Sequence, residues 1–276
     1  MYHYIWNFNK NFPYANFLSK KKFIKQINYF SKIGLINEYK EIFKPNKKVI
    51  LTFDDGFKDH LYAAEILKKY NTTGIFFVPT LPYKNNVILD VHKAHLISSK
   101  VQGNLIIKEL KKYLEQKKIF NFLNLKEKKL FYDSYKNHND DIYKKEFKKI
   151  INYYGDIKLS HKILDYLLKI FDISIKSKNF YLSKKELKYI SSLGMIIGSH
   201  ADSHTLLSRL NYRQQLSEIR KSKILLEKII NKEVNFFCYP YGGKKSYNID
   251  TINILKKLKF VLAFSVDNNI ITKNHI

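Results

Sequence analysis

Five short apolar segments recur along the chain, at residues 48–53, 74–78, 195–198, 235–239 and 260–266. Their length and nearly continuous apolar character are typical of strands buried on both faces. Between them, apolar side chains at helical spacing predict helices over residues 59–70, 212–230 and 249–258. Ser183 followed by Glu186 forms a capping-box pattern that begins another helix. This alternation predicts an α/β fold built on a parallel sheet, either open or closed into a barrel.

Residues 81–180 interrupt the alternation. They are rich in Lys, Tyr and Leu at helical spacing, which predicts a helical insertion between two parts of the core, at about 47–80 and 181–266. The insertion is interpreted in two ways: as a lid or interaction surface, or as a solvated helical layer without a chemical role. We therefore expect one domain over residues 1–276 that carries this insertion.

The composition narrows the class of protein. Of 276 residues, 45% are hydrophobic and 27% charged, which excludes collagen-like, low-complexity and wholly disordered chains. A single cysteine, Cys238, excludes an internal disulfide framework. The N-terminal segment lacks the pattern of a secretory signal, and no apolar run reaches 18 residues. These features favour a cytoplasmic protein, free or at the inner face of the membrane.

The net charge of +26 suggests an anionic partner. Only three of the 50 basic residues are arginine, however, and nucleic-acid readers favour arginine because its planar guanidinium pairs bidentately with bases and phosphates. The excess of Lys, Asn, Ile, Tyr and Phe is typical of an AT-rich coding sequence. We expect no nucleic-acid partner. The charge instead favours a membrane face or a nucleotide sugar.

Chemically suggestive residues follow the predicted strands. Because parallel strands end at one edge of a sheet, we expect these residues to lie close together. Two adjacent carboxylates after an apolar strand raise each other's pKa unless a cation compensates them, although a turn rich in aspartate is the simpler alternative. The residues concerned are Asp54 and Asp55, His200 and His204, Pro240 and Tyr241, and His3 in the opening segment.

The two histidines are spaced i and i+4. If their segment turns helically, both imidazoles fall on one face and can share a cation. Together with a carboxylate after another strand, they provide two His and one carboxylate, with coordination positions left open. Three protein ligands and an open position are typical of a catalytic metal site rather than a structural one.

Three motifs in this order resemble those of the polysaccharide deacetylases, also called carbohydrate esterase family 4 or the NodB homology domain. They are TFDDG at 52–56, His-x-x-x-His at 200–204 and YPYG at 239–242. The resemblance spans about residues 47–266 outside the insertion, and Tyr2-His3-Tyr4 is similar to the start of the capsule or poly-N-acetylglucosamine branch. It implies a distorted (β/α) barrel and a hydrolase that removes N-acetyl groups from amino sugars.

The resemblance also implies residue roles. Asp55, His200 and His204 match the ligands of one divalent metal ion, Zn²⁺ first, with Co²⁺, Ni²⁺ or Fe²⁺ as alternatives. Asp54 matches the general base. Tyr241, preceded by Pro240, matches the position that holds substrate and oxyanion through its backbone N–H.

The chain departs from the family pattern in several places. The Leu-x-His motif that often supplies the general acid is missing, and the only late histidine is His275. His3 is therefore the candidate acid, with a partly buried histidine of no catalytic role as the alternative. Ala201 replaces a Ser or Thr that steadies the histidine loop. Cys238 replaces an arginine that braces the base.

The resemblance implies an N-acetylated amino-sugar glycan, or its lipid-linked or nucleotide-linked precursor, as substrate, with peripheral membrane contact as a further expectation. Two other functions stay open. One is hydrolysis of a formyl or other non-acetyl amide on a small molecule. The other is a basic descendant without activity that binds glycan or nucleic acid.

Overall fold

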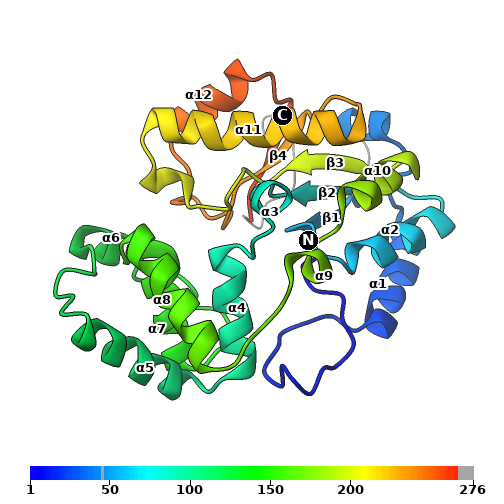
Figure 1. Cartoon of the computed structure of the whole chain (residues 1–276). Coiled ribbons are helices and arrows are strands. Elements are labelled where there is room, and N and C mark those ends of the chain that lie inside the picture. Colours follow the sequence, from blue (N-terminus) through cyan, green and yellow to red (C-terminus); the bar gives the residue numbers. More distant parts are fainter. Residues whose placement is uncertain (45–46, 267–276) are drawn as a thin grey trace. The chain divides into compact units, whose positions relative to one another are not determined.

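The computed structural model describes residues 1–44 and 47–266, which divide into two compact units (Figure 1). The first unit contains residues 1–7, 17–87 and 176 onward, and the second contains residues 8–16 and 88–175. Every strand and every motif residue discussed below belongs to the first unit, and the second unit is helical.

The first unit is organised around a five-stranded parallel sheet whose spatial order repeats the order along the chain. This confirms the predicted α/β fold, and strand order in sequence is what repeated right-handed strand–helix connections produce. The strands are β1 (Leu51–Asp54), β2 (Gly74–Val78), β3 (Ile196–Ser199), β4 (Phe236–Cys238) and β5 (Leu262–Phe264). β2 has the predicted bounds and β3 is shifted by one residue, whereas β1, β4 and β5 are shorter than expected because the apolar runs extend beyond the paired residues.

Helices cover the strands as the periodicity predicts. α2 packs against β2, α10 and α11 pack against β3, and α12 packs against α11. The capping box of Ser183 and Glu186 at the start of α10 is confirmed. The helical segments of this unit are α1 (Lys20–Ile33), η1 (Tyr39–Phe43), α2 (His60–Lys69), α3 (Leu81–Asn85), α9 (Ser177–Phe180), α10 (Lys184–Ser192), η3 (Leu207–Arg209), α11 (Tyr212–Ile230) and α12 (Ile249–Lys257).

Aromatic side chains fill the sheet core beneath the strand ends. Phe53 of β1 and Phe76 of β2 are paired in register, and their rings stack with centroids 4.5 Å apart. A Cβ at Gly198 would lie 2.4 Å from the ring of Phe77, so only glycine fits beside that ring. Close packing at this point fixes the end of β3, from which His200 extends.

The second unit is helical, and its main segment, residues 88–175, lies within the range 81–180 that the sequence marks as an insertion. It also takes in residues 8–16, where the Tyr14 backbone N–H donates to the Ser99 carbonyl (2.9 Å). Among the described residues, no helix is both long and apolar enough to span a bilayer. The helices of this unit are α4 (Asp90–Lys100), α5 (Gly103–Gln116), α6 (Leu125–Leu130), α7 (Ile142–Lys149), the π-helix η2 (Ile150–Tyr154) and α8 (Ile157–Ile170).

Candidate metal centre and its surroundings

The carboxyl ends of β1, β3 and β4 bring the motif residues together. Asp54 is the last residue of β1, His200 directly follows β3, and Cys238 is the last residue of β4. The His200 backbone N–H donates to the carbonyl of Val78 at the end of β2 (3.2 Å), which extends the sheet ladder to the site. The parallel register therefore positions groups that are far apart in sequence at one edge of the sheet.

Asp55, His200 and His204 form a buried cluster with one potential ligand atom from each residue within 4.8 Å of the others. Asp55 Oδ1 lies 3.3 Å from His204 Nε2 and 3.7 Å from His200 Nε2. The three residues are only 2–6% exposed. Because burying a lone carboxylate is costly, two imidazoles facing it mark a place where a cation can be held.

A hydrogen bond fixes the tautomer of His200. Its Nδ1 lies 2.8 Å from the backbone oxygen of Cys238, and a carbonyl can only accept, so Nδ1 carries the proton. Nε2, the ring nitrogen left for a metal ion, faces Asp55. A backbone carbonyl behind the ring is the usual way in which a metal-binding histidine is oriented.

The two histidines meet for a different reason than a helical turn. Residues 200–204 form an irregular loop in which Ala201 (φ 58°) and His204 (φ 59°) adopt the left-handed conformation. Asp55 (φ 80°) and Tyr241 (φ 65°) do so as well. Such conformations are strained for residues other than glycine and concentrate at functional sites. The expected helical turn is therefore wrong, although the proximity of the two rings is confirmed (4.7 Å between centroids).

Glu218 of α11 holds this loop, and the sequence analysis missed it. Its Oε2 accepts hydrogen bonds from the backbone N–H groups of Asp202 (3.2 Å) and Ser203 (2.7 Å) and from the Ser203 hydroxyl (2.9 Å). Burial raises the pKa of Glu218, and the bonds from Ser203 oppose that shift. This carboxylate steadies the loop despite Ala201, which carries no hydroxyl for the purpose.

The loop is also held from the other side. The Asp202 carboxylate accepts from the Thr80 hydroxyl (2.5 Å) and pairs with Lys84 (2.7 Å). The backbone oxygen of Asp202 accepts from the N–H groups of Thr80 and Leu81. The end of β2 and the start of α3 are thereby tied to the histidine loop.

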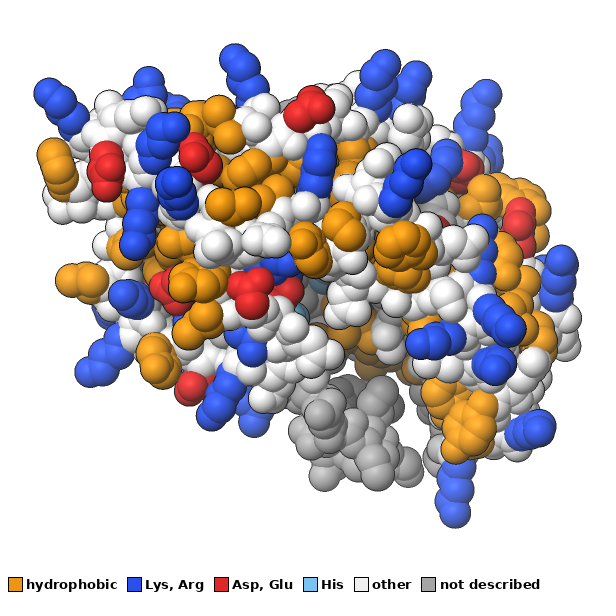
Figure 2. Space-filling view, turned by 90° about the horizontal axis from the view of Figure 1, so that it is seen from below, with side chains coloured by type: hydrophobic (Ala, Val, Ile, Leu, Met, Phe, Trp, Pro, Cys, Tyr) orange, Lys and Arg blue, Asp and Glu red, His pale blue; other side chains and the backbone are white. Residues whose placement is uncertain are grey.

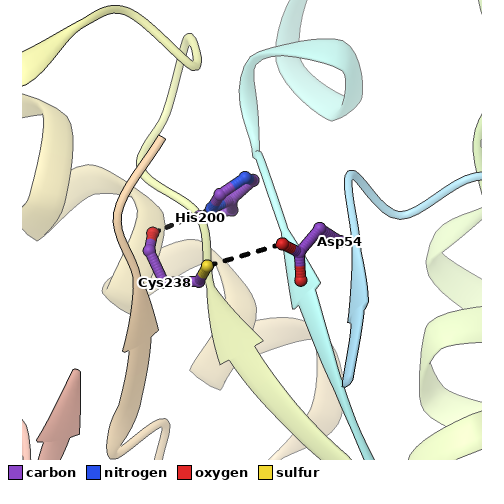
Figure 3. Close-up of side chains that lie close together, drawn as sticks. All are labelled: Asp54, His200 and Cys238. Atoms are coloured by element: carbon purple, nitrogen blue, oxygen red, sulfur yellow. Dashed lines mark hydrogen bonds between the residues drawn. The ribbon is translucent and has the colours of Figure 1, made fainter. Parts of the chain in front are cut away.

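Asp54 lies beside the cluster and contacts a thiol. The Cys238 thiol donates to Asp54 Oδ2 (3.5 Å), as Figure 3 shows. Asp54 is 3% exposed, and its Oδ1 has no hydrogen-bond partner among the described residues. Burial, and next the Asp54 charge, raise the pKa of Cys238 well above its usual value, so the thiol is neutral. One carboxylate oxygen of Asp54 is therefore left for another partner.

His3 reaches the cluster because the N-terminal segment extends the sheet. Tyr2 and Phe53 form a parallel β-bridge. The Tyr2 N–H donates to the Thr52 carbonyl oxygen (2.7 Å), and the Asp54 N–H donates to the Tyr2 carbonyl oxygen (3.0 Å). His3 Nε2 then lies 3.9 Å from Asp55 Oδ2, and its side chain is 42% exposed. His275, the late histidine, lies outside the described residues.

Two polar residues at the start of α2, the buried His60 and the partly buried Asp59, were also missed from the sequence and secure this segment. His60 Nε2 donates to the backbone oxygen of His3 (2.8 Å), and the Asp59 carboxylate accepts from the Ile5 N–H. Burial lowers the pKa of His60 and raises that of Asp59. The Tyr4 ring, between these contacts, stacks on Phe57 with centroids 4.2 Å apart.

Tyr241 and Pro240 lie at the end of β4, where the sequence places them. Pro240 is buried, and the Tyr241 ring meets that of His204 edge to face, with centroids 5.0 Å apart. The strained backbone of Tyr241 is thus next to the histidine cluster. Farther out, Figure 2 shows lysine and arginine side chains spread over the whole visible face, with few acidic ones among them.

Comparison with known proteins agrees with this arrangement. Residues 159–263 match the polysaccharide deacetylase family model, a range that includes His200, His204 and Tyr241 but begins after Asp55. YxkH of Bacillus subtilis (strain 168), provisionally named a polysaccharide deacetylase, is 26% identical over 87 residues. That alignment covers 32% of this chain and only 30% of YxkH, so this chain matches less than a third of that relative.

Solved structures share the fold across most of the chain. The Streptococcus pyogenes deacetylase PplD, in complex with acetate, has a TM-score of 0.56 at 18% identity, over 95% of this chain and 79% of PplD. IcaB of Ammonifex degensii has a TM-score of 0.52 at 17% identity (96% and 81%). A de-N-acetylase of Aggregatibacter actinomycetemcomitans has a TM-score of 0.57 at 16% identity (99% and 88%).

The fold and the cluster together define an α/β protein with a two-histidine, one-carboxylate centre at the ends of parallel strands. Over residues 159–263 the chain is similar to the polysaccharide deacetylase family, and it shares its fold with solved deacetylases of that kind. The distorted barrel expected from the sequence is the fold of these relatives.

Proposed function

We propose that this protein is a metal-dependent hydrolase that removes N-acetyl groups from an amino sugar of a cell-surface polysaccharide or its precursor. One observation carries the proposal: Asp55, His200 and His204 converge in a buried cluster, with Asp54 next to Asp55 and one of its oxygens available. Three ligands from one carboxylate and two imidazoles leave room for substrate, as a catalytic centre requires.

The donor set suits a divalent cation of the Zn²⁺ type, and Co²⁺, Ni²⁺ and Fe²⁺ accept the same ligands. Asp55 and the Nε2 atoms of His200 and His204 would hold it. Such an ion, when bound, polarises an amide carbonyl and lowers the pKa of water. The hydrogen bond from His200 Nδ1 to the Cys238 carbonyl keeps that ring in the binding orientation.

Asp54 is the proposed general base. It is buried beside the proposed ligand Asp55, and Oδ1 is free of other hydrogen bonds among the described residues. Its neighbour Cys238 is a neutral thiol at the position where the family pattern has an arginine, and the N-terminal ammonium of Met1 interacts electrostatically with Asp54. A carboxylate beside the proposed metal ligand, with one oxygen available, can accept a proton from an attacking water.

His3 is the proposed general acid, and Tyr241 the proposed oxyanion donor. His3 is close to Asp55, and its side chain is 42% exposed. It could therefore donate a proton to the leaving amine and take up another proton from solvent. The backbone N–H of Tyr241, beside His204 and preceded by the buried Pro240, would donate to the tetrahedral oxyanion. One such donor contributes roughly 2.7–4 kcal/mol to the transition state.

The proposed substrate is an N-acetylated glycan or a lipid-linked or nucleotide-linked precursor of it. The net charge of +26 would attract an anionic precursor or the anionic face of a membrane over a long range. We further propose that the protein acts in the cytoplasm at the inner membrane face. Loss of membrane association at high salt, with association at low salt, would support this location.

The function is tested by metal reconstitution. The chain is stripped with a chelator, reloaded with Zn²⁺ or Co²⁺, and incubated with N-acetylglucosamine oligomers and, separately, with formylated amines. Acetate release that depends on the metal supports the proposal. Metal binding without acetate release from any N-acetylhexosamine, or release of formate alone, contradicts it.

A further inference from the structure

A second group of metal-binding side chains lies at the same strand ends. Asp54, His200 and Cys238 are each less than 5% exposed, and one potential ligand atom from each lies within 4.8 Å of the others. Figure 3 shows the Asp54 carboxylate and the Cys238 sulfur pointing toward each other, with the His200 ring above them. The proposed hydrolysis uses Asp54 and His200 but assigns nothing to the sulfur.

The geometry of this group fits a small tetrahedral ion. A zinc-like ion with bonds of about 2.3 Å to sulfur and about 2.0 Å to oxygen separates the two ligand atoms by about 3.5 Å. Cys238 Sγ and Asp54 Oδ2 are 3.5 Å apart. A second, independent feature points to a ligand here: Asp54 Oδ1 is buried and has no hydrogen-bond partner among the described residues.

The sulfur sets the metal preference of this group. A thiolate is a soft ligand that favours thiophilic ions, whereas the Asp55 cluster offers only nitrogen and oxygen ligands. Binding replaces the thiol proton, which leaves to solvent as the metal–sulfur bond forms. The two groups share His200, so an ion at one position withdraws a ligand from the other.

We propose that Asp54, His200 and Cys238 form a second, alternative position for a thiophilic cation, which competes with the Asp55–His200–His204 position. An ion held there binds Asp54 through its carboxylate and so removes the proposed base from catalysis. The position itself is independent of the reaction, but this inhibitory effect rests on the proposed function. The protein would then be active with a metal ion of borderline softness and be inhibited by a soft metal ion.

Cd²⁺ is the sharpest probe, because cadmium–thiolate bonds give a charge-transfer absorption band that nitrogen and oxygen ligands lack. The metal-free full-length protein is titrated with Cd²⁺ in three forms: wild type, Cys238→Ser and His204→Gln. Circular dichroism verifies that each is folded. We expect the band in the wild type and in His204→Gln, with saturation near one ion per chain, and no band in Cys238→Ser.

The outcomes separate the two proposals. A missing band in His204→Gln, or a band that persists in Cys238→Ser, overturns the second position whatever the activity. Where Zn²⁺ supports acetate release, added Cd²⁺ should inhibit the wild type at concentrations at least tenfold lower than it inhibits Cys238→Ser. Equal inhibition of the two overturns the competition. Absence of acetate release with every metal contradicts the proposed function. The Cd²⁺ absorption titration then still decides whether the Asp54–His200–Cys238 position exists, because it does not depend on activity.

Discussion

The Nε2–H group of His60 donates to the backbone carbonyl of His3, across 2.8 Å and 57 positions of sequence. The neighbouring Asp59 accepts from the Ile5 N–H, so two side chains hold the segment on both sides of Tyr4. Because His3 Nε2 lies 3.9 Å from Asp55, this attachment sets where the proposed acid stands.

Removing the His60 donor should therefore lower turnover without loss of metal. In His60→Leu, which keeps apolar volume, we expect kcat to fall about tenfold or more, because displacement of a catalytic group by about 1 Å can cost up to about a hundredfold. His60→Gln, whose amide can still donate, should lose less. Steady-state kinetics and metal analysis on the same samples measure both effects.

A double-mutant cycle with His3→Ala distinguishes positioning from general destabilisation. Once the imidazole of His3 is gone, its position no longer matters, so His60→Leu should cost little further activity in that background. Additive losses would contradict the role given to His60.

His60 should also make stability depend on pH. Burial lowers its pKa in the folded state, and Nδ1, where a second proton would bind, has no hydrogen-bond partner among the described residues. The unfolded chain then binds the proton at higher pH than the folded one. The free energy of unfolding should fall as pH drops below about 6.5, by up to about 1.4 kcal/mol per unit of pKa depression.

Urea unfolding of wild type and His60→Gln between pH 7.5 and 5 measures this contribution. The variant lacks the titrating group, so its stability should fall less over the same interval. Parallel curves for the two proteins would show that His60 is not the group responsible.

Much of the site follows from the sequence because its residues directly follow apolar strands. Strand ends converge in any parallel sheet, so the aspartate pair and the two histidines could be grouped before any coordinates, and the family resemblance then singled out Asp55 as the ligand. The reason given for the closeness of the two histidines was wrong, since the left-handed backbone at Ala201 and His204 leaves no trace in residue type. Alanine and histidine at those positions look compatible with a helix.

Glu218 and His60 could not be predicted for a different reason. Each lies on an amphipathic helix, where a polar residue near the start of the helix or along its face is ordinarily solvated. Only the tertiary packing brings Glu218 to Ser203 and His60 to the backbone of His3. Both residues act through hydrogen bonds to backbone groups. Every residue has such groups, so the residue types of the partners give no sign of these bonds in the sequence.

Loss of the Glu218 carboxylate should weaken metal binding. It holds two backbone N–H groups and one hydroxyl of the histidine loop, and partners that orient metal ligands typically contribute 10- to 100-fold in affinity. We expect Glu218→Ala to bind Zn²⁺ more weakly by about that factor in a competitive chelator assay.

Glu227→Ala is the matched control for Glu218→Ala. Glu227 lies on the same helix and accepts from the Val234 N–H, away from the histidine loop. Its loss should leave metal affinity unchanged. Equal weakening in both variants would mean that α11 acts only through overall stability.

Substitution of Asp54 should lower turnover, whereas substitution of His204 should lower metal binding. Asp54→Asn keeps the shape of the side chain but removes the proposed base, so turnover should fall by about a hundredfold or more while one ion per chain is retained. His204→Ala removes a proposed ligand and should lose the metal itself. Metal content by elemental analysis, set against acetate release, separates the two. Retained metal in His204→Ala would refute its assignment as a ligand.

Metal should also stabilise the fold, because the cluster exists only in the folded state. An ion at a free concentration of 100 times its dissociation constant adds about 2.7 kcal/mol to the free energy of unfolding. For a chain of this size that is a rise of roughly 5–10 °C in melting temperature. Calorimetry of the chelated protein with and without Zn²⁺ measures the rise. Because the shift requires the Asp55 carboxylate between the two imidazoles, Asp55→Asn should reduce it sharply. If Zn²⁺ raised the melting temperature of Asp55→Asn as much as that of the wild type, the ion would bind at another site in the molecule.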